Sequence, residues 1–296
     1  MQLTTMKARG LVLLAALLAL SLTACSKGAA VKLPRLPGKP PAFDKAALES
    51  AIDGSFGGGG TCVIVADTAS GAEVYRYNSN TVCTTLLPPC ATYAIANDLI
   101  GLDAGAITPT TVLKWDRSPQ PLKSWERDAD MSTAFKETIA WWDARVAATV
   151  GLPRVRDRLK AFGYGNEAPD GRPASFWQGP AQGGELGIST RDHVQFLHRL
   201  YAGRLPVAPA SAQAVEDVMV DEIRGPATIS GKTGSCATLA DGSRSASWWV
   251  GRLKTATNDW VFAASLTDKT ENAPPGIEVE ARIKDAFAKA GIWPGL

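Results

Sequence analysis

The sequence predicts an α/β fold of the α+β sandwich type, with helices flanking an antiparallel sheet and a helical lobe inserted. Short runs rich in β-branched and aromatic residues lie near both ends of the chain, and runs with helical periodicity fill the middle. Strands before and after a long helical stretch, with a final amphipathic helix, predict one sheet with helices on its faces. We expect strands at 61–65, 73–77, 231–235, 247–253 and 260–266, and helices at 44–52, 90–102, 131–150, 152–162, 190–201, 211–219 and 278–290.

Local signals support several of these elements. Ser70-Gly71 provides a turn between the first two strands. Pro88-Pro89 stops the chain just before the helix expected at 90–102, because proline suits the first turn of a helix and not its interior. Ser189-Thr190 is a capping signal for the helix expected at 190–201.

The chain is expected to contain a targeting segment, a tether and one domain. Residues 1–24 have a positive start and an apolar run too short to span a membrane, and they end in Leu-Thr-Ala before Cys25. This ending is typical of a lipoprotein signal, in which Cys25 becomes the lipidated first residue. The alternative is an ordinary signal peptide with a chance cysteine. Residues 25–42, rich in Pro, Lys and Gly, predict an extended tether, and residues 43–296 the domain.

The predicted leader implies export and a lipid anchor in the cell envelope. Ser26 favours the periplasmic face of the outer membrane if the host is Gram-negative. The net charge is +2, and losing Lys7 and Arg9 with the leader brings it to zero, because the leader has no acidic residue. We therefore expect membrane attachment through lipid on Cys25 and no nucleic-acid partner.

Four cysteines remain after Cys25, an even number that is compatible with disulfides in an exported protein. Cys83 and Cys90 bracket a short proline-rich loop, so we expect these two to pair. Cys62 and Cys236 would then form the second pair, for which the sequence offers no further support. Free buried thiols are the alternative for both pairs.

Lys232-Thr233-Gly234 is the most informative motif of the chain. About a dozen residues later, 247–251 has the pattern of a partner strand. In penicillin-recognising serine enzymes a K-T-G strand lines one wall of the active site. The other wall carries a helix that starts with S-x-x-K, and no S-x-x-K occurs in these 296 residues.

Six segments together resemble the class D β-lactamases, the oxacillinase type of serine β-lactamase. They follow the family's order at compatible spacing, and the resemblance runs from about residue 55 to 295. It implies a serine β-lactamase-like fold. The segments are Pro89 to Asp103, Lys114 to Asp116, Trp125 to Asp128, Tyr164 to Asn166, Phe176-Trp177 with Gly187 to Ser189, and Lys232 to Gly234 with Trp248 to Gly251.

The same resemblance shows where this chain departs from the family. Ala91 stands in the place of the nucleophilic serine, and Ala94 in the place of the lysine whose carboxylated side chain is the general base. Thr138 replaces the second serine, of the S-x-V motif, and residues 274–278 offer no arginine for a substrate carboxylate. A methyl group neither forms an acyl-enzyme nor removes a proton, so the resemblance implies an inactive enzyme.

A groove for a ligand is what the resemblance leaves. Lys232 offers a positive charge and Thr233 a hydroxyl to a ligand carboxylate, and the backbone after Gly234 offers an oxyanion-binding N–H. The alternative is that the motif residues persist because they hold the fold. The candidate ligand-binding residues are Lys232, Thr233, Gly234, Tyr164, Asn166 and Trp177.

Other residues are poor candidates for a replacement nucleophile. Cys90 and Thr92 flank Ala91, but each is rotated about 100° from it around the helix. Thr133 begins a T-x-x-K sequence on the next expected helix, one turn before Thr138.

The two histidines, His193 and His198, are five residues apart on one expected helix, without the cysteines or carboxylates of a metal site. No phosphate loop or dinucleotide fingerprint is present. We expect no metal and no cofactor.

Three functions remain open at this stage. The first is a non-catalytic lipoprotein that binds a β-lactam, a peptidoglycan stem peptide or a protein in the groove. The second is a serine-type β-lactamase with residual or rerouted chemistry, and the third is a structural or interaction protein of the cell envelope. Time-dependent acylation would identify the second, and saturable reversible binding separates the first from the third.

Overall fold

The structure is a computed structural model that describes residues 43–56, 60–180, 183–236, 244–268 and 276–294. The predicted leader, Cys25 and the tether lie outside these residues. Within them, no helix combines the length and the apolar character that crossing a membrane requires.

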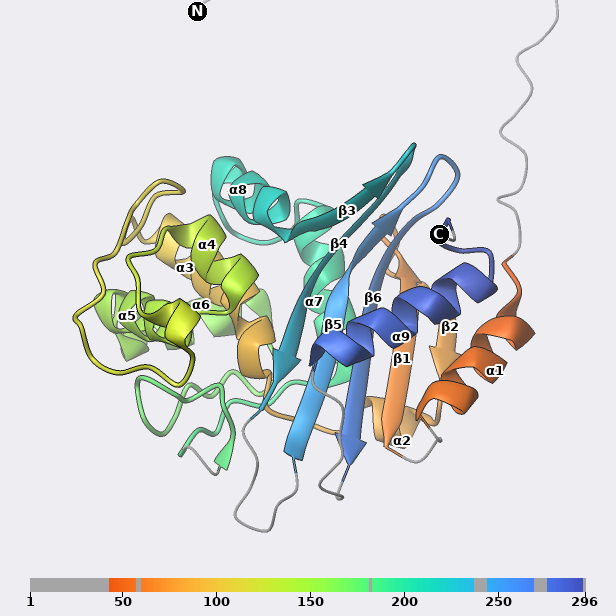
Figure 1. The fold of residues 1–296 in the computed structure, drawn as a ribbon, viewed down its shortest axis with the longest axis horizontal. Coiled ribbons are helices and arrows are strands. Elements are labelled where there is room, and N and C mark those ends of the chain that lie inside the picture. The colour runs from red at the N-terminus through yellow and green to blue at the C-terminus, as the bar shows by residue number, and fades with distance from the viewer. Residues whose placement is uncertain (1–42, 57–59, 181–182, 237–243, 269–275, 295–296) are drawn as a thin grey trace, which may run out of the picture. The chain divides into compact units, whose positions relative to one another are not determined.

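A single six-stranded antiparallel sheet forms the centre of the fold, with the strand order β2-β1-β6-β5-β4-β3 (Figure 1). The N-terminal hairpin joins the C-terminal strands through β1 and β6, where Thr61 pairs with Leu266. The predicted α/β fold class with an antiparallel sheet is therefore confirmed. The strands are β1 Thr61–Asp67, β2 Glu73–Tyr77, β3 Val220–Arg224, β4 Ala227–Ser235, β5 Arg244–Lys254 and β6 Asp259–Asp268.

Different helices cover the two faces of the sheet, because successive side chains of a strand point to opposite faces. Val63 and Val65 of β1 belong to the cluster that includes α1 (Lys45–Phe56) and α9 (Gly276–Lys289). Ile64, between them, belongs to the cluster that includes α7 (Thr190–Tyr201). Figure 1 shows α1 and α9 in front of the sheet and α7 behind it.

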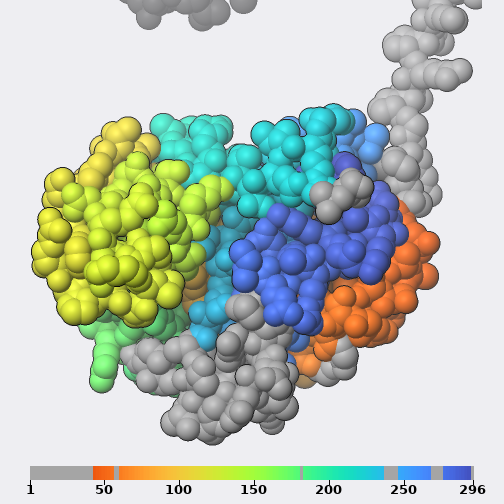
Figure 2. Space-filling model, viewed as in Figure 1, coloured from red at the N-terminus to blue at the C-terminus, as the bar shows by residue number. Residues whose placement is uncertain are grey.

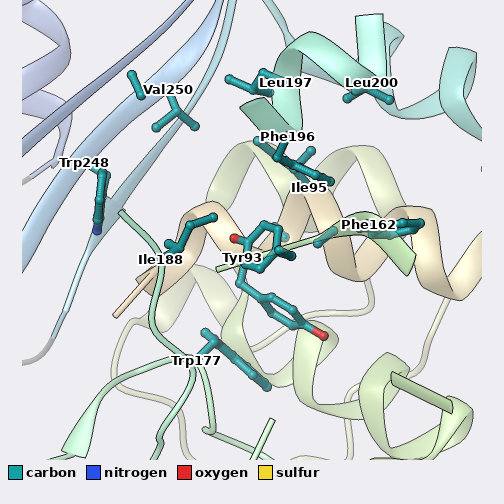
Figure 3. Close-up of a cluster of buried hydrophobic side chains, with 14 of the residues drawn as sticks. Tyr93, Ile95, Phe162, Trp177, Ile188, Phe196, Leu197, Leu200, Trp248 and Val250 are labelled. Atoms are coloured by element: carbon teal, nitrogen blue, oxygen red, sulfur yellow. The ribbon is translucent and has the colours of Figure 1, made fainter. Parts of the chain in front are cut away.

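A helical lobe lies beside the β4 side of the sheet (Figure 1). The helices of the lobe bury their apolar faces against one another, against α7 and against α8 (Pro209–Met219). Figure 3 shows part of the shared core, where the rings of Tyr93, Phe162, Trp177 and Phe196 are buried between the lobe and the sheet. The remaining helices are α2 Asn80–Cys83, η1 Cys90–Tyr93, α3 Ala94–Asp103, η2 Lys123–Trp125, α4 Met131–Glu137, α5 Ala140–Val150, α6 Leu152–Phe162 and α8 Pro209–Met219.

The single helix expected at 131–150 is wrong, because Thr138 divides it into α4 and α5. Thr138 has φ 58° and ψ 49°, the left-handed conformation that ends a helix, and Ile139 is extended. The break turns the Thr138 side chain toward Lys232 of β4, with which it makes a hydrogen bond. Residues 90–102 also differ from expectation, since the first turn, η1, is 3₁₀ and only α3 is α-helical.

Strand β3 was not expected from the sequence. It is an edge strand whose side chains alternate between half-buried and exposed, and its Asp, Glu and Arg residues weaken the apolar alternation that identifies a strand. Strand β4 also begins earlier in the chain than expected, at Ala227 instead of residue 231, because its first residues pair with β3.

The expected disulfide pairing is wrong in both pairs. Cys83 pairs with Cys62, and Cys90 pairs with Cys236. The loop between Cys83 and Cys90 does not turn back on itself, because Leu87 within it bridges to Ile188. Cys83 consequently faces β1, while Cys90 lies beyond the two prolines, next to the end of β4.

The two disulfides are expected to differ in their contribution to stability. Cys90–Cys236 closes a loop with a sequence separation of 146, against 21 for Cys62–Cys83, and the entropy lost by the unfolded chain grows with loop length. We expect Cys90→Ala/Cys236→Ala to lower the free energy of unfolding by about 5 kcal/mol and Cys62→Ala/Cys83→Ala by about 3 kcal/mol. Urea unfolding of the two double variants checks the order. Non-reducing peptide mapping that recovers a Cys83–Cys90 peptide would contradict the pairing.

Candidate functional site

The K-T-G motif lies on β4, at a part of the strand with one open edge. Strand β4 pairs with β5 from Thr228 to Ser235, but it pairs with β3 only up to Ser230. Among the described residues, no strand pairs with the other edge from Gly231 onward. The turn η1 packs against this end of β4. Figure 2 shows the helical lobe and α9 on either side of the strip that β4 forms between them. We call this unpaired edge of β4, from Gly231 to Ser235, the groove, because the sequence predicts a ligand groove at this place.

Backbone packs against backbone at Gly234. A Cβ atom there would lie 3.0 Å from Thr92 Cγ2 and 3.2 Å from the carbonyl oxygen of Pro89. On α9, a Cβ atom at Gly276 would lie 2.7 Å from the carbonyl oxygen of Gly234. The strand is thus held between η1 and the start of α9, and the Cys90–Cys236 disulfide joins η1 to the end of the strand.

Lys232 is the charged group of the groove. Its ammonium donates to Thr138 Oγ1 at 2.8 Å and to the carbonyl oxygen of Thr233 at 3.2 Å, and it lies 5.5 Å from the ring centroid of Phe135. Only 4% of Lys232 is exposed. Burial lowers its pKa to about 8, although the carboxyl of Asp143 acts in the opposite direction. Lys232 and Thr138, which the sequence singled out separately, are therefore in contact.

The two alanines lie on the first turns of η1 and α3. Ala91 is half-buried in η1, and Ala94 begins α3 with 3% of its surface exposed. Their methyl groups carry no hydroxyl or amine toward the groove. The turn η1, which carries Ala91, packs against β4, which carries the K-T-G motif.

Two buried carboxyls lie next to this region, and sequence reasoning missed both. Asp98 of α3 and Asp143 of α5 are almost fully buried, and Asn97 donates its amide to Asp143 Oδ1 at 3.1 Å. Burial raises the pKa of Asp143 to about 7, opposed by the charge of Lys232. Burial also raises the pKa of Asp98 well above its usual range, and the Asp143 carboxyl raises it further. An aspartate among the mostly apolar residues of each helix is the signal that could have found them.

The other three candidate ligand residues lie in different surroundings. Tyr164 is fully buried, edge-to-face with Phe196, and Trp177 stacks on Tyr93 with ring centroids 5.1 Å apart (Figure 3). Asn166 is exposed, and its amide holds two loop segments together through Glu185 O and Gly187 N. These contacts give Tyr164 and Asn166 a role in the fold, and only Lys232, Thr233 and Gly234 line the groove edge.

A hydroxyl–histidine pair lies directly behind Ala91. The Thr92 hydroxyl is 3.2 Å from His193 Nε2 and donates to the carbonyl oxygen of Pro89 at 2.6 Å. Both side chains are buried, and burial lowers the pKa of His193 to about 3. This pair faces the core and packs against Trp248, so it does not supply a nucleophile to the groove.

The remaining candidate groups are committed elsewhere. Cys90 is in a disulfide, and the backbone N–H of Thr133 is held by the capping side chain of Asp130. His198 Nδ1 lies 2.7 Å from the carbonyl oxygen of Thr68, and its other ring nitrogen contacts Arg204. Among the residues that the structure describes, no three His, Cys, Asp or Glu side chains are grouped as a metal site.

Comparison with known proteins places this geometry in a family. Residues 59–288 match the family described as penicillin binding protein transpeptidase domain. Beta-lactamase OXA-5 of Pseudomonas aeruginosa is 31% identical over 218 residues, which cover 71% of this chain and 80% of that protein. A class D beta-lactamase from Bacillus subtilis superposes with a TM-score of 0.73 at 26% identity, covering 82% of this chain and 97% of that chain. The C-terminal domain of the Bacillus licheniformis BlaR penicillin-receptor superposes with a TM-score of 0.73 at 25% identity, covering 85% of this chain and 96% of that chain.

The fold and the K-T-G strand thus agree with the class of domain that the family model describes. The chain belongs to the penicillin binding protein transpeptidase domain family, and class D β-lactamases are among its relatives and its structural neighbours.

Glycine at position 234 is expected to be required by packing. In Gly234→Ala the new methyl group would press on the backbone of η1 with α9 closing the other side, so we expect the free energy of unfolding to fall by about 1–3 kcal/mol. Gly54→Ala is the matched control, because nothing lies within 4 Å of its Cβ position in α1. That variant should gain about 0.5–1 kcal/mol. Urea unfolding measures both, and a neutral Gly234→Ala would contradict the close contact.

Proposed function

We propose that this chain is a non-catalytic member of its family that binds a β-lactam or a peptidoglycan stem peptide reversibly in the groove. Ala91 carries the proposal, because it lies in η1, which packs against the K-T-G strand, and the resemblance to class D enzymes places the nucleophilic serine at this position. Ala94 stands where the resemblance places the general base. Thr138, in the place of the second serine, still contacts Lys232.

The absence of the nucleophilic serine and of the general base is sufficient to abolish turnover. In serine hydrolases, removal of the nucleophile lowers turnover by about 10⁶ and leaves roughly 10³ over water from binding and oxyanion stabilisation. Without the base, neither acylation nor attack by water has a proton acceptor. The Thr92–His193 pair does not replace these groups, because it is buried and burial lowers the pKa of His193 to about 3, which makes its imidazole a weak base.

The retained groups favour an anionic, extended ligand. Lys232 can pair with a carboxylate, and the free backbone edge of β4 can accept a peptide-like strand. A low pKa for Lys232, near 8, means that its charge is lost as the pH rises through that value. Carboxylate binding is therefore expected to weaken above about pH 8.

A binding role has a parallel among the structural neighbours, since one of them is named a penicillin-receptor rather than a β-lactamase. The predicted signal and Cys25 would put the domain on a lipid anchor at the cell envelope, at the periplasmic face of the outer membrane in a Gram-negative host. Both β-lactams and stem peptides occur there.

The direct test mixes the mature protein without its lipid with a chromogenic cephalosporin, and follows hydrolysis and intact mass together. We expect no turnover above buffer and no mass increase, because neither Ala91 nor Ala94 supplies a nucleophile or a base. An active class D β-lactamase provides the positive control. Turnover, or a covalent adduct on any residue, would contradict the proposal and favour rerouted serine-type chemistry.

A further inference from the structure

A disulfide joins the groove strand to the turn that packs against it. Cys90 is the first residue of η1 and directly precedes Ala91, and Cys236 directly follows the last residue of β4. Among the residues that the structure describes, no hydrogen bond joins η1 to β4. The turn is therefore kept against the strand by close packing and by this one covalent bond.

Cys90 has a backbone conformation that residues with a side chain disfavour. Its φ is 52°, in the left-handed region where a Cβ atom comes too close to the next carbonyl oxygen. The amide of Cys90 donates to the carbonyl oxygen of Trp177 at 2.9 Å, and Trp248 Nε1 donates to the carbonyl oxygen of Pro88 at 2.8 Å. Neither hydrogen bond involves β4. A strained residue persists only while its surroundings hold it, and here the disulfide is the link on the β4 side.

The two disulfides of the chain differ in how well a reagent reaches them. Cys236 keeps 5% of its surface exposed, whereas Cys62 and Cys83 are both fully buried. Cys62 lies within β1, which pairs with a strand on each side, and Cys236 lies just beyond the end of β4. Thiol–disulfide exchange needs access to one of the two sulfurs. The bond at the groove is therefore the one that a thiol reaches first, through Cys236.

We propose that the Cys90–Cys236 disulfide is a redox-controlled latch, which holds η1 against the groove when formed and releases it when a dithiol reduces the bond. This inference rests on the proposed function, that the groove holds a ligand, and it names the regulation of that site. With the bond broken, Cys90 leaves the left-handed conformation and η1 withdraws from β4. The groove then loses the turn that carries Ala91, and the ligand loses one side of its site.

The release is a thiol–disulfide exchange in two steps. One thiolate of the dithiol attacks the Cys236 sulfur, which forms a mixed disulfide and expels the Cys90 thiolate. The second thiolate of the dithiol attacks its partner sulfur in that mixed disulfide and expels the Cys236 thiolate. Each expelled thiolate takes up a proton. The dithiol is oxidised to a disulfide by two electrons, and the protein disulfide is reduced to two thiols by the same two.

The first test measures which disulfide is reduced under native conditions. The unlipidated protein is treated with dithiothreitol, quenched with iodoacetamide at intervals, and mapped by mass spectrometry. We expect Cys90 and Cys236 to be alkylated about tenfold faster or more than Cys62 and Cys83. Equal rates, or faster reduction of Cys62–Cys83, would overturn the inference. So would the absence of reduction before the protein unfolds, because the bond would then open only together with the whole fold.

The second test locates the release by hydrogen exchange in the oxidised protein and in protein reduced under nitrogen. We expect the amides of Cys90 and Thr92, which donate to Trp177 and Pro89, to exchange about tenfold faster or more after reduction. Exchange in β1 should stay unchanged. No change at η1 would overturn the inference. Faster exchange throughout the sheet would also overturn it, because it would show global unfolding and not a latch.

A matched pair of variants separates backbone strain from loss of the bond. Cys90→Gly/Cys236→Ala removes the disulfide and allows φ 52° without strain, whereas Cys90→Ala/Cys236→Ala removes the disulfide and keeps the strain. We expect the amides of η1 to exchange more slowly in the glycine variant than in the alanine variant. Equal or faster exchange in the glycine variant would contradict a release that strain at Cys90 drives.

Penicillin binding distinguishes the failure of this inference from the failure of the proposed function. We expect benzylpenicillin to bind the oxidised protein, to bind about tenfold more weakly or less after reduction and desalting under nitrogen, and to bind as before after reoxidation. Equal binding in both states would overturn the latch and leave the proposed function intact. No binding in either state would contradict the proposed function, whereas faster exchange at η1 on reduction would still support the latch.

Discussion

The groove depends on the close approach of η1, β4 and α9 at Gly234. Only the absence of a side chain lets η1 on one side and Gly276 on the other reach the strand. The Cys90–Cys236 disulfide fixes the same approach covalently. This packing places η1, which carries Ala91, against the strand that carries Lys232.

Electrostatics inside the site differ from what the K-T-G motif alone suggests. Lys232 is buried against Thr138 and Phe135, and the carboxyls of Asp143, Glu280 and Asp98 oppose the lowering of its pKa by burial. The charge on Lys232 therefore depends on these carboxyls and on burial, and not on the lysine alone.

The fold was largely predictable from sequence, because it rests on patterns that are local in the chain. The helix at 190–201 was predicted with its bounds, since Ser189 forms a capping box with Asp192. The division at Thr138 was missed, because a single residue in the left-handed conformation does not interrupt the pattern of apolar residues. The edge strand β3 was missed, because its charged residues hide the apolar alternation that identifies a strand. The disulfides were missed for a different reason: their partners are set by strand order, which brings Cys83 to β1 and Cys236 to η1.

The candidate site was predictable only for the residues that belong to the K-T-G motif. Lys232, Thr233 and Gly234 lie at the groove edge, but Tyr164 is in the core and Asn166 holds a loop, which the spacing of their triplet does not reveal. Asp98 and Asp143 went unnoticed because 45 positions separate them in the sequence, and only the packing of α3 on α5 brings the two carboxyls together.

Equilibrium dialysis with benzylpenicillin is the most direct test of a reversible binding role for this protein. We expect saturable binding, recovery of all the penicillin intact after release, and loss of binding in Lys232→Ala but not in the exposed Lys254→Ala. Circular dichroism would verify that both variants fold. No saturable binding would contradict a retained ligand groove and favour a structural protein, whereas recovery of hydrolysed penicillin would contradict the absence of catalysis.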